Sequence, residues 1–184
     1  MYIFFDTEFT GLHKDTTLIS IGLVTENNRE FYAELTDYDR TQLEPWINEN
    51  VIPNLLYDKY TSFTHIEKNN VHMKGNKYKL KDELARWFST LSKENHIIVS
   101  DCLSYDWVLF NHIFGHALNV PNNINYIPLD ISTYLWAKGF NPDISREKFI
   151  SNTNFYKITN EQKHNALYDA KVIKEVFFKL LYFH

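Results

Sequence analysis

The sequence predicts an α/β protein in which helices flank a mixed β-sheet. Three apolar runs follow one another near the N-terminus, at residues 2–6, 18–24 and 29–35. Beyond them, segments with helical periodicity alternate with two short apolar segments, at 96–100 and 126–129. Consecutive strands followed by alternating helices and strands are typical of a mixed sheet packed against helices. We therefore expect a five-stranded sheet whose first three strands form a meander.

The second and third runs show how the meander is built. Residues 18–24 are nearly continuously apolar, which is typical of a central strand covered on both faces. Residues 29–35 alternate apolar and polar side chains, as expected for a strand that pairs back on it. Asn27 and Asn28 lie between these runs and indicate a hairpin turn, because asparagine tolerates positive φ.

Residues 36–76 are the least regular part of the sequence. We expect a helix over 39–50 with one apolar face, formed by Leu43, Trp46 and Ile47. The polar stretch 61–76 is interpreted as a surface loop. The region 36–76 could supply either a dimer contact or a rim around a substrate.

Four segments in the rest of the chain have the periodicity or capping residues of helices. Residues 79–91 are amphipathic, with apolar side chains at helical spacing. Another helix is expected to begin near Ser104, and a third to cover 131–138 after Asp130 as its N-cap. The last helix is expected to begin at Asn165, which also has the side chain of an N-cap.

Composition limits the class of protein. No repeat or linker divides the chain, so residues 1–184 are interpreted as one domain, with a polar connection at 143–162. A hydrophobic content of 44% indicates a globular protein, and a net charge of −4 argues against coating duplex nucleic acid by charge alone. The single cysteine, Cys102, excludes an internal disulfide and favours a reducing compartment. Without a signal peptide or an apolar run of about 18 residues, we expect a cytoplasmic protein that does not enter a membrane.

Two acidic residues lie where the first strand ends. Asp6 and Glu8 are two positions apart, so on a strand both side chains point to the same face. Two neighbouring carboxylates are unfavourable unless a cation lies between them, and oxygen ligands suit Mg²⁺ or Mn²⁺. On this segment alone, two solvated acids at a strand end remain an equal alternative.

Three later residues complete a candidate site. Asp106 lies in the first turn of the helix expected near Ser104, where it could instead only stabilise the helix dipole. Asp169 lies one turn into the last helix, bordered by apolar residues, and an acid in such a place is costly unless paired or metal-bound. His164 precedes the expected N-cap of that helix, and from there it can act as a general base. In isolation it would be read as a surface histidine.

These segments resemble the three motifs of the DEDDh family of 3′–5′ exonucleases, which have an RNase H-like fold. Residues 6–12 (Asp-Thr-Glu-Phe-Thr-Gly-Leu) resemble the first motif and residues 105–110 (Tyr-Asp-Trp-Val-Leu-Phe) the second. Residues 164–170 (His-Asn-Ala-Leu-Tyr-Asp-Ala) resemble the third, in its H-x4-D form. The small size and residues 18–22 are also similar to the small mycobacterial-type exoribonucleases of this family. Asp101 is a rival to Asp106, which we prefer for its aromatic neighbours at the start of a helix.

The resemblance implies an enzyme with two Mg²⁺ or Mn²⁺ ions. It implies that Asp6, Glu8 and Asp169 hold the first ion, and that Asp6 and Asp106 support the second. It implies His164 as the general base in the hydrolysis of the terminal phosphodiester. The expected product is a nucleoside 5′-monophosphate, released from the 3′ end of a single strand.

The resemblance also implies where the substrate lies. Phe9, Thr10 and Leu12 are expected to contact its 3′ end, with Leu12 against the terminal base. Trp107 is a candidate for stacking on a base. Core packing is an equal alternative for Phe9, and helix packing is the commoner role of an aromatic residue such as Trp107.

Two classes of function remain open at this point. The first is a metal-dependent exonuclease acting on RNA rather than DNA, a preference that rests on the closer resemblance alone. The second is a nucleic-acid-binding module on the same fold that has lost catalysis. All four acids and the histidine are present, which favours the enzyme. A homodimer is expected from the size of similar proteins.

Overall fold

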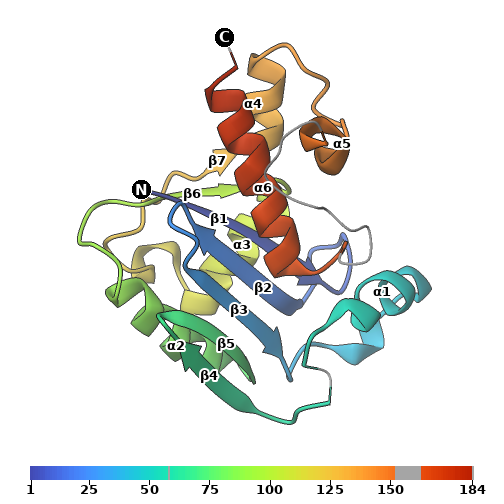
Figure 1. Cartoon of the computed structure of the whole chain (residues 1–184). Coiled ribbons are helices and arrows are strands. Elements are labelled where there is room, and N and C mark those ends of the chain that lie inside the picture. Colours follow the sequence, from blue (N-terminus) through green and yellow to red (C-terminus); the bar gives the residue numbers. More distant parts are fainter. Residues whose placement is uncertain (58, 152–162, 184) are drawn as a thin grey trace.

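The computed structural model describes residues 1–57, 59–151 and 163–183. Within these residues a seven-stranded sheet runs in the order β4-β5-β3-β2-β1-β6-β7, with helices on both faces (Figure 1). The strands are β1 Tyr2–Phe9, β2 Leu18–Thr25, β3 Glu30–Leu35, β4 Phe63–Glu67, β5 Asn70–Gly75, β6 Ile97–Ser100 and β7 Leu129–Asp130. The helices are α1 Pro45–Asn50, α2 Lys77–Ser89, α3 Leu103–Phe114, α4 Ile131–Ala137, α5 Arg146–Ile150 and α6 Ala166–Leu181, with 3₁₀ turns η1 Arg40–Gln42, η2 Ile52–Asn54 and η3 Ala117–Asn119. The predicted α/β class with a mixed sheet is confirmed.

The predicted meander is confirmed. Strands β1, β2 and β3 pair antiparallel in sequence order, and β2 lies between the other two. Asn28, in the turn between β2 and β3, has φ of 60°. Beyond β1 the sheet continues with β6 and β7, which run parallel to it.

The predicted number of strands was too low. The stretch 61–76, interpreted as a loop, contains β4 and β5, and β5 pairs parallel with β3. In β4 the side chains of His65, Ile66 and Glu67 are exposed, because this strand lies at the edge of the sheet. An exposed edge strand lacks the apolar pattern by which strands are recognised.

The predicted helix over 39–50 was also wrong. The structure has the short turn η1 followed by α1, whose first residue is Pro45. Proline restricts the preceding residue to extended backbone, and Glu44 has ψ of 160°. Within α1 only Ile47 is buried, and the Trp46 side chain is 51% exposed.

The remaining helices agree with prediction except at their ends. Asp130 caps α4 and Asn165 caps α6, each accepting hydrogen bonds from backbone N–H groups of the first turn. Ser104 is not a cap, because α3 already begins at Leu103. The connection 143–162 contains α5, and its residues 152–162 lie outside the described part of the chain. In the described ranges, no helix combines the length and the apolar character needed to cross a membrane.

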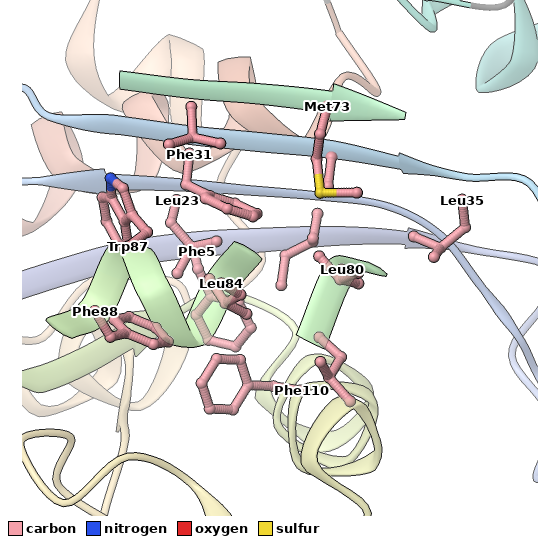
Figure 2. Packing of buried hydrophobic residues seen from close by; sticks show 14 of the residues in the cluster. Phe5, Leu23, Phe31, Leu35, Met73, Leu80, Leu84, Trp87, Phe88 and Phe110 are labelled. Atoms are coloured by element: carbon pink, nitrogen blue, oxygen red, sulfur yellow. The ribbon is translucent and has the colours of Figure 1, made fainter. Parts of the chain in front are cut away.

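Helices pack on the two faces of the sheet as separate layers. Along β1, Ile3 and Phe5 belong to the cluster under α2 and α3, whereas Phe4 belongs to the cluster under α4, α5 and α6. Figure 2 shows the first cluster, in which Leu84, Trp87 and other side chains of α2 meet the sheet. Residues of β1 therefore alternate between two helical layers.

Close contact between α6 and the sheet depends on Gly22. An ideal Cβ at this position would lie 2.2 Å from the Leu167 backbone nitrogen and 2.4 Å from the Ala166 carbonyl carbon. Only glycine allows the start of α6 to approach the backbone of β2 so closely. Gly22 pairs with Asp6 in the adjacent β1, so this contact brings the first turn of α6 beside the acidic end of β1.

Candidate active site

Three of the predicted acids come together on the α6 face of the sheet. Asp6 and Glu8 point to this face because they alternate with Phe5 and Thr7 along β1. Asp169 lies in the first turn of α6. This turn packs against Gly22 of β2, which pairs with Asp6 of β1. The expected grouping of Asp6 and Glu8 with Asp169 therefore follows from one strand end and one helix start.

His164 lies beside two of these acids. Ligand atoms of Glu8, His164 and Asp169 all lie within 4.8 Å of one another. As expected, His164 precedes the cap of α6, and its φ of 61° lies in the left-handed region. Its ring meets the Trp46 ring edge-on at 5.0 Å between centroids.

Asp106 reaches the site from the opposite face of the sheet. It is fully buried in the first turn of α3, and its carboxylate accepts hydrogen bonds from the Thr7 and Ser100 hydroxyls. Burial raises the pKa of both Asp6 and Glu8, and the Asp106 charge adds to this effect. Each carboxylate oxygen has a second lone pair, so these hydrogen bonds leave capacity for a further ligand.

Asp101, the rival candidate, has a different environment. Its carboxylate accepts two hydrogen bonds from the Arg146 guanidinium, at 2.8 and 2.6 Å, and a third from the Ser132 hydroxyl. A bidentate pair of this kind neutralises the carboxylate and fixes its position. Asp106 has no such cation among the partners of its side chain in the described residues.

The four predicted acids share an unfavourable electrostatic environment. Burial is the largest cause in each case, and it raises the pKa of Asp106 to about 6 and of Asp169 to about 7. The pKa values of Asp6 and Glu8 are also raised, by burial first and then by neighbouring carboxylates. Grouped carboxylates with raised pKa values are costly for the fold and are found at sites that bind cations or transfer protons.

These carboxylates fit a hard divalent cation. Carboxylate oxygens are the preferred ligands of Mg²⁺ and Mn²⁺, and a histidine nitrogen is acceptable to Mn²⁺. A cation among Asp6, Glu8 and Asp169 would reverse the repulsion that raises their pKa values. The donor set is therefore consistent with the predicted metal site.

Two cavities meet at Asp6, His164 and Asp169, which line both. The first, called here the apolar cavity, has a volume of about 560 Å³ and is also lined by Thr7, Glu8, Phe9, Gly11, Leu12, His13, Glu44, Trp46 and Ile47. The second, called the polar cavity, has about 420 Å³ and is also lined by Asp101, Cys102, residues 143–147, Lys163, Val172 and Ile173. Asp6 and Asp169 thus lie between a space lined by large apolar side chains and a space lined by charged ones.

The predicted substrate residues are not equivalent. Leu12 is 73% exposed and lines the apolar cavity together with Phe9, whose ring also stacks on Tyr105 at 5.3 Å. Thr10 is fully buried, and its hydroxyl donates to the Gln42 side chain.

Trp107 lies apart from both cavities. Its ring stacks on Phe110 at 5.1 Å, and it packs against the core under α3. The packing alternative therefore describes its position in this structure.

Sequence reasoning missed three residues at the site. Trp46 was expected to face the core, although its place beside Glu44 and Pro45 was a signal for a surface turn. Arg146 and Lys163 line the polar cavity from segments without a recognisable motif. Lys163 forms an ion pair with Glu147 at 3.2 Å.

Sequence comparison finds related proteins of named activity. Two curated proteins from two strains of Mycobacterium tuberculosis, each named a 3′–5′ exoribonuclease, are 42% identical to this chain over 55 residues. The match covers 30% of this chain and 33% of each relative, so it spans about a third of their length. A family model described as an exonuclease matches residues 3–177. With nearly its whole length matched, the chain belongs to this exonuclease family.

Proposed function

We propose that this protein is a metal-dependent 3′–5′ exonuclease that shortens single-stranded RNA and releases nucleoside 5′-monophosphates. The observation that carries the proposal is the convergence of uncompensated carboxylates and His164 at the junction of two cavities. Family membership supports the exonuclease reaction, and the names of the mycobacterial relatives support RNA as the substrate.

Four carboxylates would hold the metal. In the proposal Asp6, Glu8 and Asp169 hold one Mg²⁺ or Mn²⁺ ion, and Asp6 and Asp106 support a second. Such ions activate a water molecule and neutralise charge on the phosphate. Asp106 acts from beneath, where the Thr7 and Ser100 hydroxyls fix its carboxylate.

His164 takes the proton of the attacking water in this proposal. Burial and, after it, the nearby Lys163 charge lower the pKa of the His164 imidazole. A lowered pKa keeps the ring neutral, and only a neutral ring can accept a proton. His164 lines both cavities, so it can reach a group bound between them.

The apolar cavity is the proposed site of the terminal nucleoside. Leu12 and Trp46 are both more than half exposed there and offer apolar surface to a base, and Phe9 lines the same wall. Stacking of a base on an aromatic side chain contributes about 1–3 kcal/mol. The cavity would then place the last phosphodiester at Asp6 and Asp169.

A nuclease assay with matched variants tests the proposal. A 5′-labelled single-stranded RNA and the DNA of the same sequence are incubated with Mg²⁺, with Mn²⁺ and with EDTA. We expect a ladder that shortens from the 3′ end of the RNA, and none with EDTA. His164→Ala should lower kcat by about 10²- to 10⁴-fold, the usual contribution of a general base.

The control is His65→Ala, whose side chain is 68% exposed on the edge strand β4. This variant should retain wild-type activity. A ladder on DNA alone would change the substrate, and binding without any cleavage would favour the catalytically silent module. Light scattering on the same preparation measures whether the chain forms the expected homodimer.

A further inference from the structure

We propose that Asn54 and Tyr32 are positioning residues that hold His164 in the active site, an inference that rests on the proposed function. Neither residue lines the apolar or the polar cavity. Both form hydrogen bonds to the segment Lys163–Asn165, which carries His164 at its centre.

The segment needs external support because its backbone is unusual. His164 has φ of 61°, a conformation that costs a non-glycine residue on the order of 1–3 kcal/mol unless the surroundings hold it. On its C-terminal side, Asn165 begins α6 and accepts from the Tyr168 N–H through Oδ1. This cap uses the oxygen of the Asn165 amide and leaves its nitrogen free to donate elsewhere.

Asn54 forms hydrogen bonds to the residues on both sides of His164. The Asn54 side-chain Nδ2 donates to the Lys163 carbonyl at 2.7 Å, and the Asn54 backbone carbonyl accepts from Asn165 Nδ2 at 2.9 Å. Nδ2 also donates to the Asn50 carbonyl at 2.7 Å, which connects the Asn54 side chain to the end of α1. Trp46, in the same helix, contacts the His164 ring, so α1 and η2 support both the backbone and the ring.

Tyr32 holds the same amide from the sheet. The Tyr32 hydroxyl lies 3.2 Å from Asn165 Nδ2, from which it accepts, and it donates to Glu34 Oε1 at 2.9 Å. Burial and the Glu34 charge raise the Tyr32 pKa, so the phenol keeps its proton and donates in one direction only. Glu34 is itself fixed by Lys74, whose Nζ lies 3.4 Å from Oε2. A buried series of polar contacts therefore links Lys74 of β5 and Glu34 of β3, through Tyr32, to Asn165 at the start of α6.

The test compares Asn54→Ala with Asn54→Asp and with the matched control Asn48→Ala. Asn48 Nδ2 also donates to two carbonyls, those of Leu43 and Glu44, but it has no bond to residues 163–165 in the described structure. Asn54→Asp keeps the size of the side chain and removes its donors. We expect both Asn54 variants to lower kcat by about ten- to hundredfold with little change in KM, because misplacing a catalytic group costs this much. The control should match wild type.

A double-mutant cycle shows whether Asn54 acts through His164. In the His164→Ala background, Asn54→Ala should cause no further loss of kcat, because the group it positions is already gone. Tyr32→Phe should behave in the same way with a smaller loss, since Asn165 Nδ2 keeps its bond to Asn54. A full additional loss in the His164→Ala background would overturn the inference, as would wild-type kcat in Asn54→Asp.

Hydrogen exchange gives a readout that does not depend on activity. Amides of residues 163–170 should exchange faster in Asn54→Ala than in wild type and Asn48→Ala, measured below the melting temperature of all three. If the wild-type protein cleaves no nucleic acid, the proposed function fails, and this exchange measurement alone decides the positioning role. Equal exchange in the three proteins would overturn it.

Discussion

Glu34 and Glu8 are both nearly buried glutamates on neighbouring parts of one sheet, and their surroundings differ completely. Glu34 on β3 has an ion pair with Lys74 and accepts hydrogen bonds from the Tyr32 hydroxyl and the Tyr57 N–H. Glu8 on β1 faces carboxylates, and burial followed by the charges of Asp169 and Asp106 raises its pKa.

This difference separates a structural acid, Glu34, from an acid proposed to be functional, Glu8. A buried carboxylate beside a cation and hydrogen-bond donors has its charge compensated within the fold. A buried carboxylate among other carboxylates destabilises the fold without a compensating charge, and such groups are concentrated at functional sites. Burial alone does not distinguish the two glutamates, but the charge of their neighbours does.

Removal of metal should have the largest effect. EDTA should reduce nuclease activity to background, because the acids then lack the cation that their arrangement requires. Saturating Mn²⁺ at about 100 times its dissociation constant should stabilise the protein by about 2.7 kcal/mol. Calorimetry would show this as a rise in melting temperature.

Two variants make that measurement specific. The rise should be lost in Asp169→Asn and retained in Glu34→Gln, because only the first removes a proposed ligand. An equal rise in Asp169→Asn would mean that the ion binds elsewhere.

Removing the Lys74 charge from the Lys74–Glu34 ion pair should cause the next largest effect, a loss of folding stability. Lys74→Met removes the cation from Glu34, and an uncompensated buried charge typically costs about 3–5 kcal/mol. Urea unfolding measures this loss. Lys68→Met changes a lysine in the turn after β4 and should change stability little. Unchanged stability in Lys74→Met would show that Glu34 does not depend on its cation.

Gly22→Ala should weaken metal binding by the proposed site acids, although residue 22 is not one of them. The added methyl group would lie 2.2 Å from the Leu167 nitrogen, and α6 must move away from β2 to accommodate it. We expect a loss of about 1–3 kcal/mol from overpacking, together with reduced metal affinity as Asp169 moves from Asp6. Titration calorimetry with Mn²⁺ measures the affinity.

The control for this variant is Gly115→Ala. It adds a methyl group in open space, at φ of 77° and away from α6. It should lose some stability but keep the affinity for Mn²⁺. Equal affinities in wild type and Gly22→Ala would show that Asp169 does not depend on this contact.

A pH series on metal-free protein should show the smallest effect. The pKa of Asp169 is raised to about 7 in the folded state from an unfolded value near 3.9. Folding therefore favours the protonated form, and the contribution of Asp169 to stability is lost as pH rises from about 4 through 7. The Asp169→Asn variant has no carboxyl group to ionise, so it avoids this loss of stability.

The metal-free variant should accordingly be more stable than wild type at pH 8, with a difference that shrinks toward pH 4. Thermal unfolding across this range measures the difference. A difference that grew toward low pH would have the wrong sign for a raised pKa and would contradict the assignment.

The sequence was sufficient for several features that depend on neighbours along the chain. Apolar runs identified β1 and β2, and short polar side chains identified the caps Asp130 and Asn165. The spacing of Asp6 and Glu8 placed both on one face, since the period of a strand is two. The order of the motifs indicated the family.

Only the tertiary structure decided what depends on distant segments. It added β4 and β5, whose edge position hides them from an apolar pattern, and it turned Trp46 to the surface. It brought Asp106 to the acids from the opposite face of the sheet.

The clearest case is the support of His164. Tyr32 and Asn165 are 133 positions apart in sequence, yet they share a buried hydrogen bond. Helical and strand periodicity are local properties, whereas the contact of two such residues is fixed by how layers pack. The sequence by itself therefore predicted which residues carry the proposed chemistry, and the packing of α6 on the sheet decided how they are held.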